Sequence, residues 1–122
     1  MKYLCMVIVD EKKIKSLSEA DSQALDDESL EYDKTIRKSG HFLVAQALES
    51  VDAAATVRLR NGKVSVTDGP FAETHEQIGG FILIEANDLN EAIRVASGIP
   101  AIRFGAVEVR PVKELIASNP QS

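Results

Sequence analysis

The chain has one cysteine, Cys5, among its 122 residues, and this scarcity excludes an intramolecular disulfide. No apolar run approaches the roughly 20 residues that are needed to cross a bilayer. The apolar segment at the N-terminus ends at Asp10 and is too short for the core of a signal peptide. We therefore expect a cytoplasmic protein with no membrane partner.

Positive charge is also in short supply. Lys and Arg number 14 against 19 Asp and Glu, so the net charge at neutral pH is −5. Nucleic acids and anionic membrane surfaces are recognised by basic faces, and this balance argues against both as direct partners. The length favours one domain over residues 1–122, with residues 118–122 as a loose tail.

Two segments, residues 3–9 and 79–84, are apolar at nearly every position and predict strands buried on both faces. Shorter strands are predicted at residues 42–45 and 105–110. The pattern Ser18-x-x-Asp21 predicts the start of a helical region whose main part spans residues 26–39, with Gly40 as its C-cap. A second helix is predicted after Asp88. Its expected inward face consists of Leu89, Ala92, Ile93 and Ala96. Residues 10–13 are expected to form a charged turn.

The pair Asn61-Gly62 lies between two alternating segments and predicts a type I′ hairpin turn. A two-residue turn sets Arg60 opposite Lys63, Leu59 opposite Val64, and Val57 opposite Val66. One face of the hairpin is then apolar, while the other carries Arg58, Arg60 and Lys63 and must face solvent. Asp68 shares the face of Val64 and Val66.

The order of these elements is β-α-β, hairpin, β-α-β. It predicts a ferredoxin-like α+β fold with one antiparallel sheet and both helices on one face. Two helices cover only one face of the doubly apolar strands, so the second face requires another cover. A second copy of the same sheet would provide it and make a homodimer. The alternative is that the hairpin and the C-terminal segment fold over that face.

One stretch carries a resemblance to a known family. Asp68-Gly69-Pro70-Phe71 and the following residues through Gly80-Phe81 resemble the DGPF signature of the YCII-like family of small bacterial proteins. The likeness extends more loosely over nearly the whole chain, including Tyr32 and Gly40. The resemblance implies a dimeric α+β barrel. It also implies either an enzyme with a His–Asp pair in a small pocket, as in a member that dechlorinates an aromatic ring, or a regulatory module, because other members are fused to sigma-factor domains.

The resemblance assigns the Asp of that pair to Asp68 and places the His at Ser29, and no His occurs on the predicted helix. We expect Asp68 to be the catalytic proton-transfer group, Ser29 and Tyr32 to orient a substrate through their hydroxyls, and Phe71 and His75 to line the same pocket. Leu25, Ser29, Tyr32 and Ile36 share one helical face and point inward. Two structural alternatives remain: Asp68 closes a turn by bonding backbone N–H groups, and Tyr32 packs in the core.

No cofactor and no metal is expected. Glu73, His75 and Glu76 are close in sequence, but nothing fixes three ligands on one face. Gly79-Gly80 lacks the surroundings of a phosphate loop and is expected to permit close backbone approach. Cys5 is expected to be an inert core residue, and His41 a surface or half-buried one. Three functions remain open: a small-molecule enzyme, a non-catalytic ligand-binding or regulatory module, and a protein whose dimer surface is its whole function.

Overall fold

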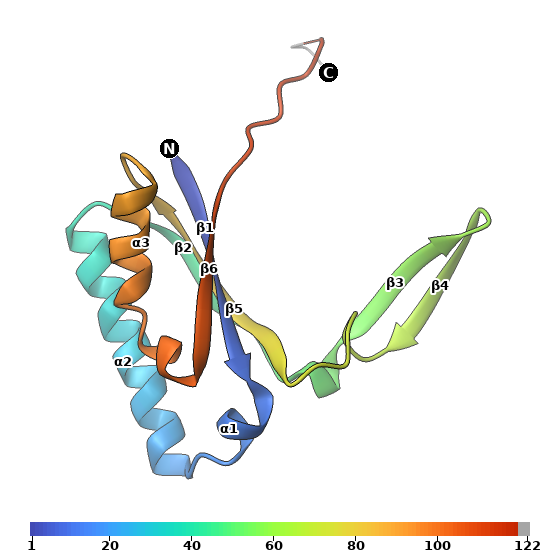
Figure 1. The fold of residues 1–122 in the computed structure, drawn as a ribbon, viewed down its shortest axis with the longest axis horizontal. Helices are drawn as coiled ribbons and strands as arrows, with labels where there is room; N and C mark the ends of the chain where they lie inside the picture. The colour runs from blue at the N-terminus through green and yellow to red at the C-terminus, as the bar shows by residue number, and fades with distance from the viewer. Residues whose placement is uncertain (120–122) are drawn as a thin grey trace.

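Four antiparallel strands form the main sheet of the computed structural model, which describes residues 1–119 (Figure 1). They are β1 (Lys2–Asp10), β2 (Phe42–Ala47), β5 (Glu76–Glu85) and β6 (Gly105–Pro111). Their order in the sheet is β2-β5-β1-β6. When the hairpin is left out, this is the order second, third, first, fourth of a ferredoxin-like fold, which confirms the predicted fold class.

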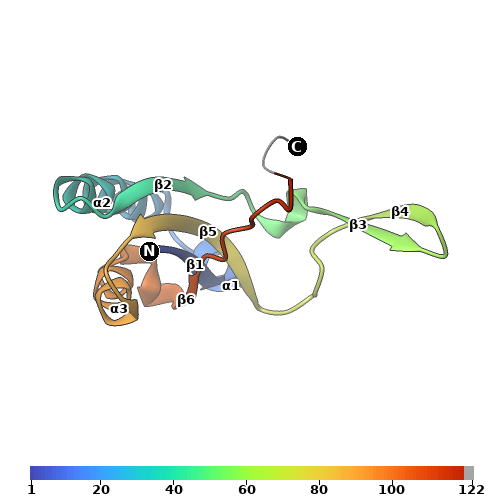
Figure 2. The same cartoon turned by 90° about the horizontal axis from the view of Figure 1, so that it is seen from above.

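Both long helices, α2 (Glu19–Lys38) and α3 (Leu89–Ser97), lie on the same side of the sheet (Figures 1 and 2). Ser18 and Asp88 cap them by accepting the amide protons of Asp21 and Glu91, respectively. Helix α2 therefore begins at the predicted cap and includes the residues before 26. The predicted inward face of α3 is partly wrong, because Val95 is buried whereas Leu89 and Ile93 are almost half exposed.

Three short helices complete the part of the chain that the structure describes. Helix α1 (Glu11–Lys15) occupies the place of the predicted charged turn, because the Asp10 carboxylate accepts the amide protons of Lys12 and Lys13 and so nucleates a helical turn. The 3₁₀-helix η1 (Val51–Ala53) precedes the hairpin, and the 3₁₀-helix η2 (Pro100–Phe104) connects α3 to β6.

The core lies between the sheet and the two long helices. On β1, Tyr3, Cys5, Val7 and Val9 are all buried on the helix side. The residues between them, including Leu4 and Met6, face the other side, where they pair with Leu83 and Phe81 of β5. We call this second side the open face, because no helix covers it within residues 1–119. The expectation that β1 and β5 are apolar on both faces is therefore confirmed.

The hairpin consists of β3 (Ala55–Arg60) and β4 (Lys63–Asp68) and forms a sheet of its own. Asn61 and Gly62 have φ values of 51° and 76°, as a type I′ turn requires, and the predicted register is confirmed. The hairpin extends away from the main sheet on the side opposite the helices (Figures 1 and 2). It does not fold over the open face.

Strand β5 begins at Glu76, three residues before its predicted start, and a bulge interrupts its pairing with β1 between Val7 and Ile8. A Cβ atom at Gly80 would lie 2.9 Å from the backbone oxygen of Gln46, which shows how closely β2 approaches. Close backbone approach was the expected role of this glycine pair. Residues 112–119 form no helix or strand, and the predicted tail, 118–122, continues outside the described residues. None of the helices in residues 1–119 has both the length and the apolar character to cross a bilayer.

Candidate functional site

A cavity of about 550 Å³ lies between α2 and the sheet. This volume lies in the range of small-molecule sites. Its walls are mainly apolar and come from β1, β5 and α2, while α1, η2 and the end of β2 surround it. The apolar lining residues include Val7, Val9, Leu17, Leu25, Leu30, Leu48, Ile82 and Ile99.

Polar groups enter the cavity along one stripe of α2. Ser22, Asp26, Ser29 and Asp33 all line it, at spacings of four, three and four residues. Because a helix turns by 3.6 residues, these spacings place the four side chains on the same face. Leu25 and Tyr32 flank the stripe and also line the cavity. The helix therefore presents a polar edge to a space whose lining is mainly apolar.

Asp33 is the most unusual member of this stripe. Its side chain is half-buried, and its carboxylate makes no hydrogen bond with any of residues 1–119. Burial raises the pKa of this carboxyl above its ordinary value of 3.8, and the nearby Arg37 guanidinium opposes that rise. Asp33 was not among the site residues predicted from the sequence. The available signal was its spacing, because it follows Ser29 by four residues and precedes the buried Ile36 by three.

Ser29 and Tyr32 both point inward, as their shared helical face predicted, and both line the cavity. The Tyr32 hydroxyl donates to the backbone oxygen of Val95 and so joins α2 to α3. Burial raises the pKa of this phenol, and the proximity of Cys5 adds to the rise. This arrangement matches the packing alternative for Tyr32, because its hydroxyl already has a partner.

Two other charged groups at the cavity are engaged elsewhere. The Glu11 carboxylate accepts the Val51 amide proton at 2.9 Å and the Ser50 hydroxyl proton at 3.2 Å, which holds η1 against α1. Lys15 pairs with Asp52 at 2.8 Å. The carboxylates of the α2 stripe are thus left to meet a ligand, together with that of Glu49, which also lines the cavity and has no hydrogen bond or ion pair with any of residues 1–119.

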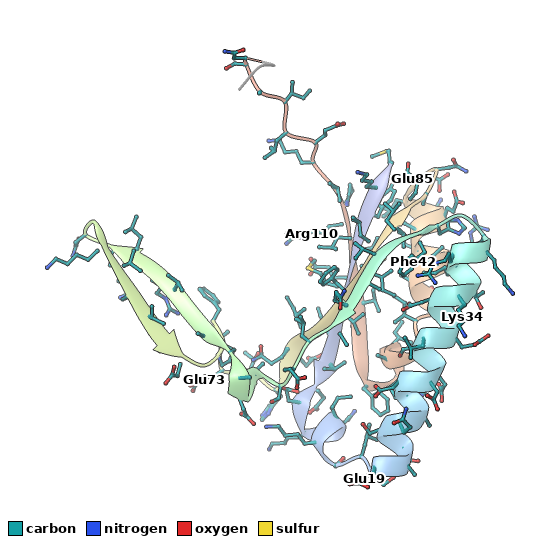
Figure 3. All side chains as sticks on the ribbon, turned by 180° about the vertical axis from the view of Figure 1, so that it is seen from behind. Glu19, Lys34, Phe42, Glu73, Glu85 and Arg110 are labelled. Atoms are coloured by element: carbon teal, nitrogen blue, oxygen red, sulfur yellow. The ribbon has the colours of Figure 1, made fainter. Side chains whose placement is uncertain are left out.

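Asp68 and His75 line a different space, an open recess of about 490 Å³ at the base of the hairpin. Glu73, which Figure 3 labels at this base, also lines it. Asp68 lies opposite Ala55 at the end of β4 and, as predicted, shares the face of Val64 and Val66. However, its carboxylate makes no hydrogen bond with any of residues 1–119, so the structural alternative, in which it closes a turn by bonding backbone N–H groups, does not describe this conformation.

Phe71 lines neither space. Its side chain is 80% exposed, and the Arg58 guanidinium lies 5.4 Å from the centre of its ring. Within one chain, the structure therefore groups Ser29 with Tyr32 and Asp68 with His75, but it does not unite these pairs in one pocket. The physical reason is the course of the hairpin, which carries Asp68 away from α2.

Two further expectations concern histidine and metal ions. His41 is half-buried and lies between two partners, Ser39 Oγ at Nδ1 and Glu91 Oε1 at Nε2, each at 2.7 Å. Its contacts thus clamp α2 to α3. Within the described part of the chain, no three His, Cys, Asp or Glu side chains gather as a set of metal ligands.

Comparison with known proteins places this arrangement in a family. The model of the YCII-related domain matches residues 1–116, which include the cavity, the hairpin and the recess. The chain belongs to the YCII-related domain family. An uncharacterized protein of Rhizobium meliloti (strain 1021) is 36% identical over 115 residues, which cover 92% of each chain. The YCII-related domain therefore spans nearly the whole sequence, and both the cavity and the recess are parts of it.

Proposed function

We propose that this YCII-related protein, a member of the DGPF subgroup, is a homodimer that binds a small molecule in the cavity between α2 and the sheet. One observation carries the proposal: the half-buried Asp33 carboxylate, which no protein group hydrogen-bonds within residues 1–119, lies in an apolar cavity. A buried polar group without a partner is costly, and such groups concentrate at binding sites.

The chemistry of the lining indicates the class of ligand. Asp26 and Asp33 supply negative charge from α2, and Glu49 adds a carboxylate after β2, while most of the other lining residues are apolar. Lys15 is the one basic residue of the lining, and it is paired with Asp52. A molecule with an apolar body and a protonated amine would satisfy both surfaces, because the amine donates hydrogen bonds to carboxylates and compensates their charge.

The open face supports the dimer. Leu4 pairs with Leu83 and Met6 pairs with Phe81 across β1 and β5, so apolar side chains form a continuous stripe along the centre of the sheet. Contiguous apolar patches of this kind are rare on monomers and mark interaction surfaces. The helices cover the opposite side and the hairpin points away, so a second open face is the cover that best fits this stripe.

A thermal-shift measurement with two matched probes tests the binding site. 2-Phenylethylamine and phenylacetate have the same apolar body and opposite charge. We expect the amine to raise the melting temperature, since a ligand of the native state stabilises by mass action, and the acid to have no effect. Asp33→Asn should remove the effect of the amine. Asp27→Asn, on the same helix but outside the cavity, should retain it.

Two results would contradict this proposal: equal stabilisation by both probes, or an amine effect that survives in Asp33→Asn. Light scattering tests the dimer separately, because a monomer of 13.3 kDa and a particle of twice that mass are easily distinguished.

A second candidate function is acid–base catalysis by Asp68. The observation that favours it is the shared recess, in which Asp68 and His75 would provide a carboxylate and an imidazole for proton transfer. Asp68→Asn tests this candidate. Once a substrate has been found, the variant should bind it normally and lose turnover, and unchanged turnover would contradict the assignment.

A further inference from the structure

The hairpin, residues 55–68, has two chemically distinct faces and no cover for either. We call it the arm. Its apolar face consists of Val57, Leu59, Val64 and Val66, and each of these side chains is between 64% and 71% exposed. An isolated two-stranded hairpin is marginally stable in water at best. A surface that covers the apolar face would therefore stabilise the arm.

The direction of the arm indicates where that surface lies. In both views the helices are on one side of the main sheet and the arm is on the other, the side of the open face (Figures 1 and 2). A second copy seated on the open face would therefore lie beside the arm. The occupant that best fits the open face is thus also within reach of the arm.

The length of the arm suits this arrangement. Its strands have six residues each, which at about 3.3 Å per residue gives roughly 20 Å. Two sheets that pack face to face lie about 10 Å apart, and a helix adds roughly another 10 Å. The tip of the arm can therefore pass the partner's sheet and reach its helix layer.

The distribution of charge gives an independent reason for a contact between the tip of the arm and the helix layer of a second copy. Residues 19–33 of α2 include seven acids and no base, whereas the arm, residues 55–68, includes three bases and one acid, Asp68 at its base. Arg60 and Lys63 at the tip form no ion pair within the described residues. In a single chain, α2 and the arm lie on opposite sides of the sheet. These opposite charges can meet only between two copies.

The rim of the cavity offers a matching apolar surface. Leu30 of α2 and Leu48, which follows β2, both line the cavity and are 62% and 51% exposed. Asp26 lines the cavity on the same side of α2 as Leu30. Aliphatic side chains next to a carboxylate complement the arm, whose tip combines Leu59 and Val64 with Arg60 and Lys63.

We infer that in the dimer each arm crosses to the partner, packs its apolar face on the exposed leucines at the rim of the cavity, and sets Arg60 and Lys63 beside the acidic half of α2. The inference rests on the proposed dimer and deepens it. The binding site is then composite, because the arm of one chain closes the cavity of the other.

Intermolecular paramagnetic broadening tests this arrangement directly. A nitroxide is attached at Ser65→Cys in unlabelled protein, which is then exchanged into dimers with ¹⁵N-labelled wild-type chains. Ser65 lies opposite Arg58 on the arm, away from the apolar face. We expect the amide signals of residues 19–33 and of Leu48 to lose intensity in the labelled chain and to recover when ascorbate reduces the nitroxide.

The other outcomes contradict either the arm contact alone or both the arm contact and the dimer. A dimer whose α2 signals keep their intensity, or in which broadening falls elsewhere, overturns the inference and leaves the proposed dimer and binding site standing. A monomer overturns both the inference and the dimer. The amine probe still reports on the cavity in either case.

A charge reversal provides a second test by sedimentation equilibrium. Lys63→Glu sets an acid against the acidic half of α2, so the dimer dissociation constant should rise by at least about tenfold. Lys12→Glu makes the same change of charge on α1, away from the arm, and should leave the constant near that of the wild type. Equal effects of the two variants would overturn the contact.

Discussion

Nε2 of His41 lies 2.7 Å from Oε1 of Glu91, and this contact joins the segment after α2 to the first turn of α3. Glu91 also accepts the amide proton of Asn87 at 2.7 Å through its other oxygen. The carboxylate thus holds two segments that are distant in sequence. It therefore helps fix the position of the helix layer over the sheet.

The pair predicts a specific dependence of stability on pH. The hydrogen bond from His41, followed by that from the Asn87 amide, holds the pKa of Glu91 below its ordinary value of 4.5. A lowered pKa in the folded state stabilises the protein above the unfolded pKa, and this contribution is lost as pH falls through the folded pKa. We expect Glu91→Gln to be less stable than the wild type at neutral pH and to lose less stability on acidification below pH 4.5. Urea unfolding at several pH values measures both effects.

Glu114→Gln, at an exposed position, is the control for this measurement. Parallel curves of stability against pH for Glu91→Gln and the wild type would contradict the prediction.

Gly98 and Tyr32 form a second link between the helices. A Cβ atom at Gly98 would lie 2.5 Å from the Tyr32 hydroxyl oxygen and 2.7 Å from two of its ring carbons. The ring is held by its hydroxyl, which donates to Val95, so it has little room to withdraw. We expect Gly98→Ala to lower the free energy of unfolding by about 2 kcal/mol through overpacking. Tyr32→Phe keeps the ring and loses one hydrogen bond, which should cost about 1 kcal/mol. Chemical denaturation measures both values, and a neutral Gly98→Ala would show that the helices can separate at this point.

The sequence predicted those parts of the fold that depend on neighbours along the chain. The Asn61-Gly62 turn, the caps at Ser18 and Asp88, and the strand at residues 105–110 are local patterns, and the structure has all of them. Even the sheet order follows from two β-α-β units. Helix α1 was missed because the Asp10 cap opens only one helical turn, too short for a periodic pattern.

The candidate site was harder to predict because it depends on where the arm goes. The position of Asp68 within its strand was predicted correctly, but no local rule gives the angle between a hairpin and a separate sheet. The arm forms a separate sheet that extends away from the main sheet, and Asp68 therefore lies outside the cavity between α2 and the main sheet. Asp33 was missed for a different reason. A charged residue next to an apolar stripe is normally taken as solvated, and the packing of the helix onto the sheet decides that Asp33 is half-buried.

Cys5 should be chemically silent in the folded protein. It is fully buried, and burial raises the pKa of its thiol from 9.0 to about 11. Because the thiolate is the reactive form, we expect no reaction with a disulfide reagent at pH 8 under native conditions and one equivalent in concentrated urea. Absorbance of the released thiol measures the reaction. Rapid labelling of the native protein would contradict the burial and would also rule out selective spin labelling at Ser65→Cys in the presence of Cys5.

Asp33 should lower the stability of the unliganded protein. Its pKa is raised in the folded state, so the unfolded carboxyl ionises first, and the free energy of unfolding falls as pH rises through the unfolded value near 3.8. Asparagine has nearly the same shape and no charge to desolvate. We therefore expect Asp33→Asn to have a higher melting temperature than the wild type at pH 7, while it loses the response to 2-phenylethylamine. A gain in stability with a loss of binding is typical of residues kept for function.

Asp27→Asn is the matched control, since Asp27 is exposed and accepts a hydrogen bond from Gln23. A loss of stability in Asp33→Asn would mean that the carboxylate has a structural partner and is not kept free for a ligand.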